Sequence, residues 1–516
     1  MVAELVAELL DVVHTDRVLD ALAEVAAFDR YQASAGIEQA ADVVAARAEA
    51  AGLSEVGIQR FRADGKAQWW TFEAPTSWTP TVARIAADGF EVDHARQPFA
   101  LATHSAALTG KSLPVHRLGE DVRGSIVALD SVPSTFRELE QAGALGFVTD
   151  GPARRSGHRG RIELPADTSL AGFSLLPEEF AALRDRADVE VRLGPEASMP
   201  VVSGLLPGEG DGEIWLMAHL CHPRPGANDN ASGVAALLGV AEALAGTRNE
   251  LGIRFIWGPE FTGTAAVLHQ AGKLPEAVLN LDMVGQDQLQ CGAPFVVERP
   301  PDYLPPQLAA VAELVVAETF AQTAEHPGTW EAVEFAGFSD HALFADPVIG
   351  RPAVQFCHPA DRFNHTAADS LDKVAPVEML RSTAAAAVVA RLAAGRYAGL
   401  DLAKVLERWH HGKNVAARRH RPDDGPKLVR KWDGPLNVRA MLAAAPPSTQ
   451  DAVGALVAED KANLSLIFNL GIRITGRRTG TELAEAAASA RSRPVDPGTA
   501  AVLLSAFADS GWAEAV

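Results

Sequence analysis

The sequence predicts an α/β fold in which a mostly parallel central sheet is flanked by helices. Short apolar runs that are typical of strands alternate with longer amphipathic segments between residues 199 and 396. Polar residues gather where several of these apolar runs end, as expected at the carboxyl ends of parallel strands. The chain has 516 residues, which is too long for one simple core, so further domains are expected around this unit.

The elements of this unit follow from periodicity and from capping residues. Helical periodicity runs from about Leu5 to Ala51 and ends at Gly52, and an edge strand is expected from Val56 to Phe61. The later strands are expected at residues 213–219, 252–258, 277–284 and 352–358, and the later helices at residues 230–245, 305–323 and 376–395.

Two other parts of the chain have a different pattern. Residues 79–198 predict short strands and turns, including a strand over Val122–Asp130, a helix that ends near Gln141 and a further strand. This part also holds a basic cluster, which is either a solvated loop or a site for the acidic end of a substrate. The cluster consists of Arg154, Arg155, Arg159 and Arg161.

After about Tyr397 the sequence is first rich in Arg, Lys and His and then predicts short helices. These are expected near residues 437–445, 463–469, 481–489 and 498–510. With the Gly-rich turn between them, they resemble a winged-helix module, and we assign residues 397–516 to a winged-helix-like domain.

Composition restricts the partners and the location. The formal net charge of −20 disfavours a nucleic-acid footprint over the whole molecule. The N-terminus lacks the basic start of a signal peptide, and no apolar run is long enough to span a bilayer, so no membrane contact is expected. With only three cysteines, a disulfide framework is not expected, and a cytoplasmic location fits.

Five polar residues have the chemistry of a metallohydrolase. Metal-dependent hydrolysis needs imidazole and carboxylate ligands that converge on zinc, and a carboxylate that takes a proton from the attacking water. Such residues lie at or just after predicted strands, or at the turn before a helix, and an acid inside an apolar run such as Leu-Asp-Met-Val is costly unless it is paired. They are His219, Asp229, Glu260, Asp282 and His365.

The order and motifs of these residues resemble the zinc aminopeptidases of the M28 type, which include bacterial leucine aminopeptidases and glutamate carboxypeptidase relatives. The resemblance rests on Gly226-Ala-Asn-Asp-Asn-Ala-Ser-Gly, Asn280-Leu-Asp-Met-Val-Gly, Ser339-Asp-His and His365-Thr-Ala-Ala-Asp. It implies that Asp229 bridges two metals, that His219 and Asp282 complete one site and that His365 belongs to the other. Glu260 would then be the general base.

The resemblance also suggests how the chain is divided. Residues 79–198 are similar to the protease-associated domain, a small β-rich insert found in many peptidases. The peptidase domain would therefore be formed by residues 1–78 and 199–396, on either side of this insert.

Two departures from the family pattern concern the ligands. The family's His-x-Asp is His219-Leu-Cys221 here, so the acid that orients the first histidine is missing. The family's Glu-Glu pair is Glu260-Phe261, so the second metal has lost a carboxylate. Three outcomes remain open: His222 replaces the lost ligand, the site holds one metal with Glu260 as base or ligand, or the site is degenerate and inactive. These departures, with the C-terminal helices, resemble a variant aminopeptidase-like branch.

The sequence thus predicts a hydrolase with one or two Zn²⁺ ions that cleaves an N-terminal residue or a related amide from a small peptide or conjugate. The alternative is a degenerate peptidase fold that acts as a binding or regulatory protein through its winged-helix domain. Its basis is a set of basic residues, Arg418, Arg419, Arg421, Lys427, Arg430 and Lys431. A nucleophilic pair of Cys221 and His222 is disfavoured, because adjacent residues of an extended segment point in opposite directions. Assembly into a homo-oligomer is left open.

Overall fold

A mixed sheet of eight strands forms the centre of the molecule in the computed structural model, which describes residues 1–133, 136–412 and 425–516. The central strands β13, β12, β14 and β17 run parallel to one another, whereas β11 pairs antiparallel with both β1 and β13. In spatial order they are β1 (Ser54–Phe61), β11 (Met199–Leu206), β13 (Gly252–Gly258), β12 (Glu213–His219), β14 (Val278–Asp282), β17 (Ala353–Cys357), β15 (Phe295–Glu298) and β16 (Trp330–Val333).

Both faces of this sheet are buried, which explains why its central strands are continuous apolar runs. In β12, Leu216 and Ala218 face one hydrophobic core, whereas Trp215 and Met217 face another. The first core contains residues of α1 (Val2–Val12), α2 (Thr15–Ala26), α3 (Ala35–Ala50), α7 (Gly233–Ala243), α10 (Gln307–Gln322) and α12 (Pro376–Ala394). The second contains residues of α8 (Thr262–Gln270), α11 (His341–Ala345), β2 (Gln68–Trp69) and β3 (Phe72–Glu73).

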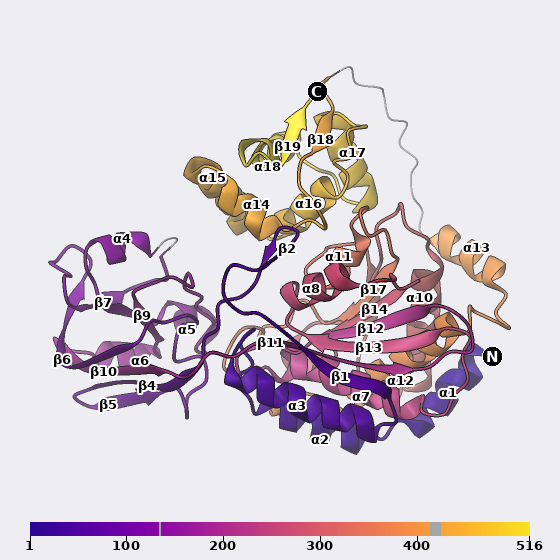
Figure 1. The fold of residues 1–516 in the computed structure, drawn as a ribbon, viewed down its shortest axis with the longest axis horizontal. Helices are drawn as coiled ribbons and strands as arrows, with labels where there is room; N and C mark the ends of the chain where they lie inside the picture. Colours follow the sequence, from indigo (N-terminus) through magenta and orange to yellow (C-terminus); the bar gives the residue numbers. More distant parts are fainter. Residues whose placement is uncertain (134–135, 413–424) are drawn as a thin grey trace.

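A second sheet, of seven strands, lies between β1 and β11 in the sequence and stands at one end of the molecule (Figure 1). We call residues 80–193 the insert. Its strands β6 to β9 pair in parallel, and β5, β4 and β10 extend that sheet in antiparallel fashion. The elements are β4 (Pro80–Ala87), β5 (Phe90–Asp93), β6 (Leu108–Arg117), β7 (Ile126–Leu129), α4 (Arg137–Gln141), β8 (Gly146–Thr149), α5 (Gly151–Ser156), β9 (Ala171–Ser174), α6 (Pro177–Ala182) and β10 (Arg186–Leu193).

The third part, residues 425–516, is called the C-terminal region and lies over the α8 and α11 side of the central sheet (Figure 1). Its core includes Phe335 and Ala345 of the main body, and Arg430 forms an ion pair with Asp346 at 3.0 Å. The elements are β18 (Leu428–Arg430), α14 (Val438–Ala444), α15 (Pro447–Glu459), α16 (Ala462–Gly471), α17 (Gly480–Ala490), α18 (Pro497–Asp509) and β19 (Ala513–Ala515). The designation as a winged helix stays a prediction.

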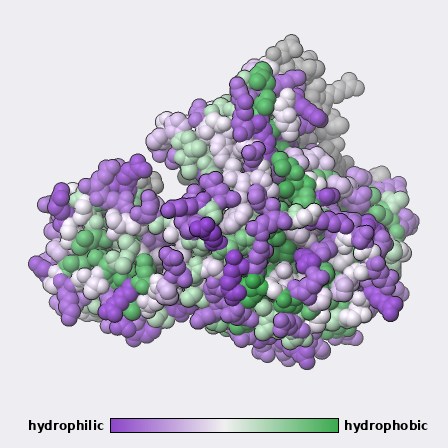
Figure 2. Space-filling view, in the orientation of Figure 1, coloured by the Kyte–Doolittle hydropathy of each residue, from purple (hydrophilic) through white to green (hydrophobic). Residues whose placement is uncertain are grey.

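The secondary structure agrees with the sequence pattern for β12 and β13, whose bounds are those expected, and β1 is an edge strand as predicted. The sequence did not predict the helices α8, α9 (Gln288–Cys291), α11, α13 (Leu402–Gly412) and α15, nor the strands β15 and β16. Among the described residues, no helix combines the length and the apolar character needed to cross a bilayer. Hydrophilic side chains spread over all parts of the face shown in Figure 2.

Candidate metal centre

Three neighbouring strands deliver the first group of polar side chains to one edge of the sheet. His219 is the last residue of β12, Asp282 is the last residue of β14, and Glu260 follows β13 after one proline. These strands are adjacent and parallel, so their carboxyl ends meet. His219 Nε2 lies 3.1 Å from Asp282 Oδ1. One ligand atom from each of the three residues lies within 4.8 Å of the others, and we call them cluster A.

Asp229 comes from the loop between β12 and α7, where the prediction of a helix from residue 230 is wrong. Asp229 and Asn230 have non-helical backbone angles within an irregular turn, Ala227–Ser232, and the regular helix begins at Gly233. The turn is held by Asn230, whose Oδ1 accepts from the N–H groups of Gly233 and Met283. Gly226 precedes the turn at φ 46°, and a Cβ there would lie 2.6 Å from His222 Nδ1. Only glycine fits that position.

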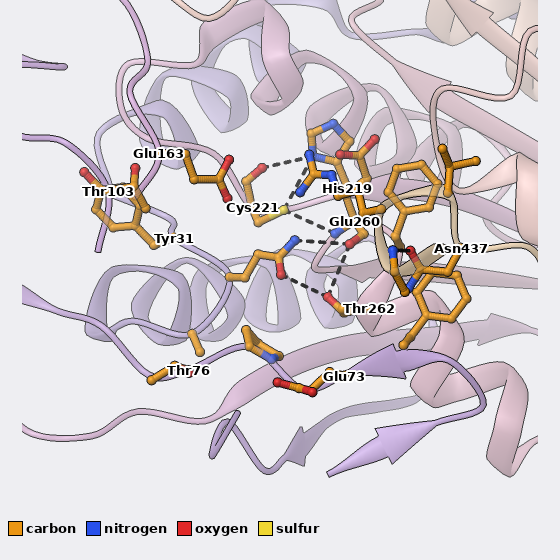
Figure 3. Close-up of a pocket in the computed structure, with 18 of the residues that line it drawn as sticks. Tyr31, Glu73, Thr76, Thr103, Glu163, His219, Cys221, Glu260, Thr262 and Asn437 are labelled. Atoms are coloured by element: carbon orange, nitrogen blue, oxygen red, sulfur yellow. Dashed lines mark hydrogen bonds between the residues drawn. The ribbon is translucent and has the colours of Figure 1, made fainter. Parts of the chain in front are cut away.

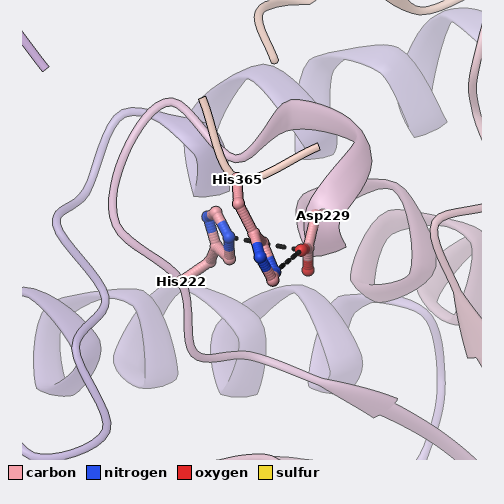
Figure 4. Close-up of side chains that lie close together, drawn as sticks. All are labelled: His222, Asp229 and His365. Carbon is pink, nitrogen blue, oxygen red and sulfur yellow. Dashed lines mark ion pairs between the residues drawn. The ribbon is translucent and has the colours of Figure 1, made fainter. Parts of the chain in front are cut away.

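A second group of ligand atoms surrounds the other oxygen of Asp229. Asp229 Oδ2 lies 3.2 Å from His222 Nε2 and 3.2 Å from His365 Nε2 (Figure 4). Asp229 Oδ1 lies 3.2 Å from His219 Nε2 of cluster A. We call His222, Asp229 and His365 cluster B. The carboxylate of Asp229 therefore stands between two separate sets of ring nitrogens.

Hydrogen bonds on the far side of each ring determine what these nitrogens offer. His222 Nδ1 lies 2.7 Å from the Pro223 carbonyl oxygen, and His219 Nδ1 lies 3.0 Å from the Cys221 carbonyl oxygen. A carbonyl oxygen only accepts, so each Nδ1 carries the donated proton. In the neutral ring Nε2 then presents a lone pair to a carboxylate oxygen, which is also an acceptor. A cation between the ring nitrogen and the carboxylate oxygen removes this repulsion between two acceptors. Imidazole and carboxylate are both ligands that zinc accepts.

The distances between the ligand atoms and the pKa shifts of His222 and Asp229 also fit a bound cation. Ligand atoms about 2.1 Å from a tetrahedral zinc lie roughly 3.4 Å apart, close to the separations seen around Asp229. Burial lowers the pKa of His222, which disfavours a second proton as the alternative solution. Burial alone would raise the pKa of Asp229, but His222 and its neighbours hold it well below its usual range. The residues present therefore fit a metal ion in each cluster.

Cys221 stands where the family pattern has an acid, and its contacts with His219 could not be predicted from the sequence. The acid that would orient His219 is missing, and the backbone carbonyl of Cys221 takes that role. The Cys221 thiol lies farther from the ring, with Sγ 3.9 Å from His219 Nδ1, and this sulfur also accepts the Glu260 N–H at 3.2 Å. Cys221 thus links the end of β12 to the residue after β13.

Glu260 is buried among other acids. Burial, together with the nearby charges of Asp282 and Asp340, raises the pKa of Glu260 to about 8 against the opposing effect of His219. Burial by itself lowers the pKa of His219, but Asp282 and Glu260 outweigh it and raise that pKa well above its usual range. Asp340, from the Ser-Asp-His motif, also accepts the Phe261 N–H at 2.7 Å. Phe261 itself lines the cavity described below and has φ 58°.

Two buried residues that sequence reasoning missed hold the loop of Asp229. The Arg30 guanidinium donates to the carbonyl oxygens of Leu220 and Gly226, on either side of His222. Asp369 accepts the N–H group of Asp229 at 3.0 Å, and burial raises its pKa to about 8. Arg30 follows a helix in an ordinary polar stretch, so no local pattern marks it, whereas Asp369 was quoted only as part of the His-Thr motif.

The insert holds His365 in place. The Arg161 N–H donates to the His365 carbonyl oxygen at 2.9 Å, and the Ala367 N–H donates to the Arg159 carbonyl oxygen at 2.8 Å. His365 has φ 58° and its side chain is 51% exposed, whereas the His222 side chain is 3% exposed. The most exposed side chain of cluster B thus depends on backbone pairing with the insert.

A cavity of about 850 Å³ opens over both clusters (Figure 3). Cluster A contributes His219 and Glu260 to its lining, and all three residues of cluster B line it. The insert contributes Arg161 and Glu163, and the C-terminal region contributes residues from 436 to 444 together with 464 and 468. The site is therefore enclosed by all three parts of the chain.

Comparison with known proteins agrees with this geometry. Residues 201–390 match the family model described as Peptidase family M28. This part of the chain is therefore similar to the peptidases of that family. Both clusters lie within the matched residues, and they are consistent with the dinuclear metal site of M28 zinc peptidases.

Solved structures share the fold at low identity. The crystal structure of a protein proposed to be a peptidase from Clostridium acetobutylicum aligns with a TM-score of 0.57 at 14% identity, over 99% of this chain and 98% of that chain. A zinc aminopeptidase from Bacillus subtilis aligns with a TM-score of 0.56 at 17% identity, over 76% of this chain and 97% of that chain. At these identities the likeness concerns the fold alone.

A curated relative matches over a shorter stretch. It is a Clostridium acetobutylicum protein proposed to act in polysaccharide biosynthesis and described as having an aminopeptidase-like domain, 35% identical over 96 residues. The match covers 18% of this chain, and the chain spans 22% of that relative's length.

Of the basic residues behind the regulatory alternative, Arg418, Arg419 and Arg421 lie outside the described residues. Lys431 forms an ion pair with Glu514 at 2.5 Å, as Arg430 does with Asp346. The domain bounds, the likeness of the insert to a protease-associated domain and the oligomeric state stay predictions.

Proposed function

We propose that the protein is a zinc-dependent hydrolase of the aminopeptidase type, which cleaves an N-terminal residue or a related amide from a small peptide or conjugate. The observation that carries this proposal is the carboxylate of Asp229, whose two oxygens face ring nitrogens of two separate clusters. The M28 match of residues 201–390 supports it. The cytoplasmic location remains a proposal that rests on the sequence.

In this proposal each cluster holds one ion. His219, Asp282 and one oxygen of Asp229 would bind the first, and His222, His365 and the other oxygen would bind the second. His222 then replaces the carboxylate that is lost at Phe261, which is the first of the three outcomes left open by the sequence. Bound zinc would polarise the substrate carbonyl and lower the pKa of a coordinated water.

Glu260 is the proposed general base. Its carboxylate would take a proton from the attacking water and pass it to the leaving amine. A raised pKa of about 8 suits a group that must accept and then release a proton near neutral pH. Because Glu260 also lies within reach of the other ligand atoms of cluster A, a role as a ligand is the alternative.

The decisive experiment combines metal analysis with hydrolysis. The purified protein should contain zinc and should release amines from neutral aminoacyl anilides. Asp282→Asn should lower the rate on the order of a thousandfold and lower the zinc content. Asp211→Asn, at an exposed position before β12, is the matched control and should change neither. Wild-type protein that neither retains zinc nor hydrolyses any such substrate would refute the proposal.

A further inference from the structure

We propose that Arg161 selects substrates that carry a carboxylate near the scissile amide, so that short acidic peptides or conjugates are the preferred class. This inference rests on the proposed hydrolase function and deepens it. The carboxylate has two chemical sources, an acidic N-terminal side chain or the free carboxyl end of a short leaving group. Both present the same anion to the same guanidinium.

The four arginines of the basic cluster have different surroundings. Arg154 pairs with Asp150 at 2.7 Å, Arg159 pairs with Glu179, and Arg155 is exposed. Of these four, only Arg161 lines the cavity over the clusters. The basic cluster is therefore not one solvated loop, because one of its members faces the candidate site.

The position of Arg161 is fixed by the backbone of a proposed metal ligand. Its N–H donates to the His365 carbonyl oxygen at 2.9 Å, so its side chain starts beside cluster B. The Arg161 side chain is 27% exposed and therefore combines partial shielding from water with access from the cavity. Partial desolvation strengthens an ion pair with a bound anion relative to one at the surface.

Arg161 stays protonated and positively charged in this site. Burial opposes it, but Glu163, Asp229 and Glu260 raise the pKa of Arg161 above its ordinary value. One contact is already made, between Arg161 and Glu163 at 2.6 Å. A guanidinium has five N–H donors in a planar fork, so donors remain for a second carboxylate.

A second cation lines the same cavity and acts on Glu163. Arg439 belongs to α14 of the C-terminal region and lines the cavity. Burial raises the pKa of Glu163, but Arg161 and then Arg439 hold it below its usual value. Glu163 thus lies in the field of two arginines, one from the insert and one from the C-terminal region.

The other charged and apolar residues of the lining restrict where an anion can bind. Arg30 is fully buried and already donates to backbone carbonyl groups, and Glu73 stands on β3, away from Glu163 in Figure 3. Toward the C-terminal region the wall is mostly apolar, with Phe261, Phe338, Val438, Leu464 and Phe468, and Arg439 is the charged side chain that this region adds to the lining. A substrate carboxylate is therefore favoured on the insert side, where Arg161 meets it.

The test uses matched pairs that differ in one charge. Leucylglycine is compared with leucylglycinamide for a leaving-group carboxylate, and a glutamyl anilide with the glutaminyl anilide for an acidic side chain. The wild-type protein should prefer the acidic member of at least one pair. Arg161→Gln should lower kcat/KM for that member by roughly tenfold to a hundredfold and leave the neutral partner within about threefold. The affected pair identifies the source of the carboxylate.

Two further variants and a binding measurement complete the design. Arg161→Lys keeps the charge but loses the planar fork, so an intermediate effect is expected. Arg155→Gln removes an exposed arginine of the same insert and should change neither pair. Calorimetry with a reduced-amide analogue of leucylglycine, which cannot be cleaved, should show weaker binding to Arg161→Gln at unchanged zinc content.

The possible failures can be distinguished. If the wild-type protein hydrolyses both members of each pair equally, or if Arg161→Gln lowers all rates alike, selection by Arg161 is refuted while the hydrolase stands. If no neutral or acidic amide is cleaved, the proposed function falls, and this inference falls with it.

Discussion

The Asp229 carboxylate stands between clusters A and B, which differ in what builds them. Cluster A takes its three residues from the ends of adjacent parallel strands, β12, β13 and β14. Cluster B takes its residues from loops: His222 is paired with Arg30 of the N-terminal segment, and His365 is paired with the insert. The end of a buried sheet can thus assemble the three residues of cluster A, whereas cluster B needs three distant segments of the chain.

The comparison of clusters A and B depends most on Asp229, which we propose bridges the two metal ions. Asp229→Asn should remove the charge that both clusters share, so the bound zinc should fall for both and activity should drop on the order of a thousandfold. Zinc analysis with parallel rate measurements checks this. Retention of one full equivalent of zinc would show that the two clusters do not share a ligand.

The two histidines of the His-x-Cys-His segment separate the clusters. His222→Ala should release the zinc of cluster B and leave that of cluster A, whereas His219→Ala should have the reverse effect. In each case the affected site should lose affinity by at least roughly a hundredfold, since a direct ligand counts for more than a supporting group. Competition with a metal indicator checks the stoichiometry and the affinity. Wild-type zinc binding by His222→Ala would favour a single metal at cluster A.

The contribution of the insert to zinc binding at cluster B can be tested without substituting a proposed metal ligand. A Cβ at Gly160 would lie 2.9 Å from the Pro152 Cβ and 3.7 Å from the His365 carbonyl oxygen. Gly160→Val should displace the paired strand and weaken zinc at cluster B about tenfold to a hundredfold, as loss of an orienting group does. Gly272→Val is the control, since nothing lies within 4 Å of a Cβ there. Equal loss at both clusters would contradict the proposed difference.

The smallest effect is expected at Asp29, which holds the far end of the His222 loop. Asp29 Oδ2 accepts from Arg224 Nε at 2.9 Å, and His94 Nε2 lies 3.3 Å away. Burial opposes ionisation, but His94 and Arg224 lower the pKa of Asp29 to about 2. A depressed pKa stabilises the folded protein above the unfolded value near 4, and this stability is lost as the pH falls toward 2.

Asp29→Asn should therefore lower the free energy of unfolding by about 2 kcal/mol at neutral pH. The difference from the wild-type protein should shrink below about pH 4. Thermal unfolding at several pH values measures this. Asp42→Asn, which removes an exposed partner of Arg60, should cost less than about 1 kcal/mol and serves as the control.

The sequence by itself determined the parallel strands at the middle of the central sheet, β13, β12, β14 and β17, and the residues of cluster A. Apolar runs bounded by turn residues are local signals in the sequence. The bounds of β12 and β13 are those expected, because a strand that is buried on both faces is apolar along its whole length. Once parallel neighbours are inferred, residues such as His219 and Asp282 must meet at one edge. The general chemistry of the site was therefore accessible from the order of these residues.

Only the tertiary structure decided how cluster B and the cavity are formed. The positions of His222, His365 and Arg161 depend on pairing between segments far apart in the chain, such as Arg30 with His222 and Gly160 with Thr366. Backbone groups make these pairings, so side-chain chemistry leaves no trace of them in the sequence. The same reason explains why the carbonyl of Cys221, rather than its thiol, orients His219.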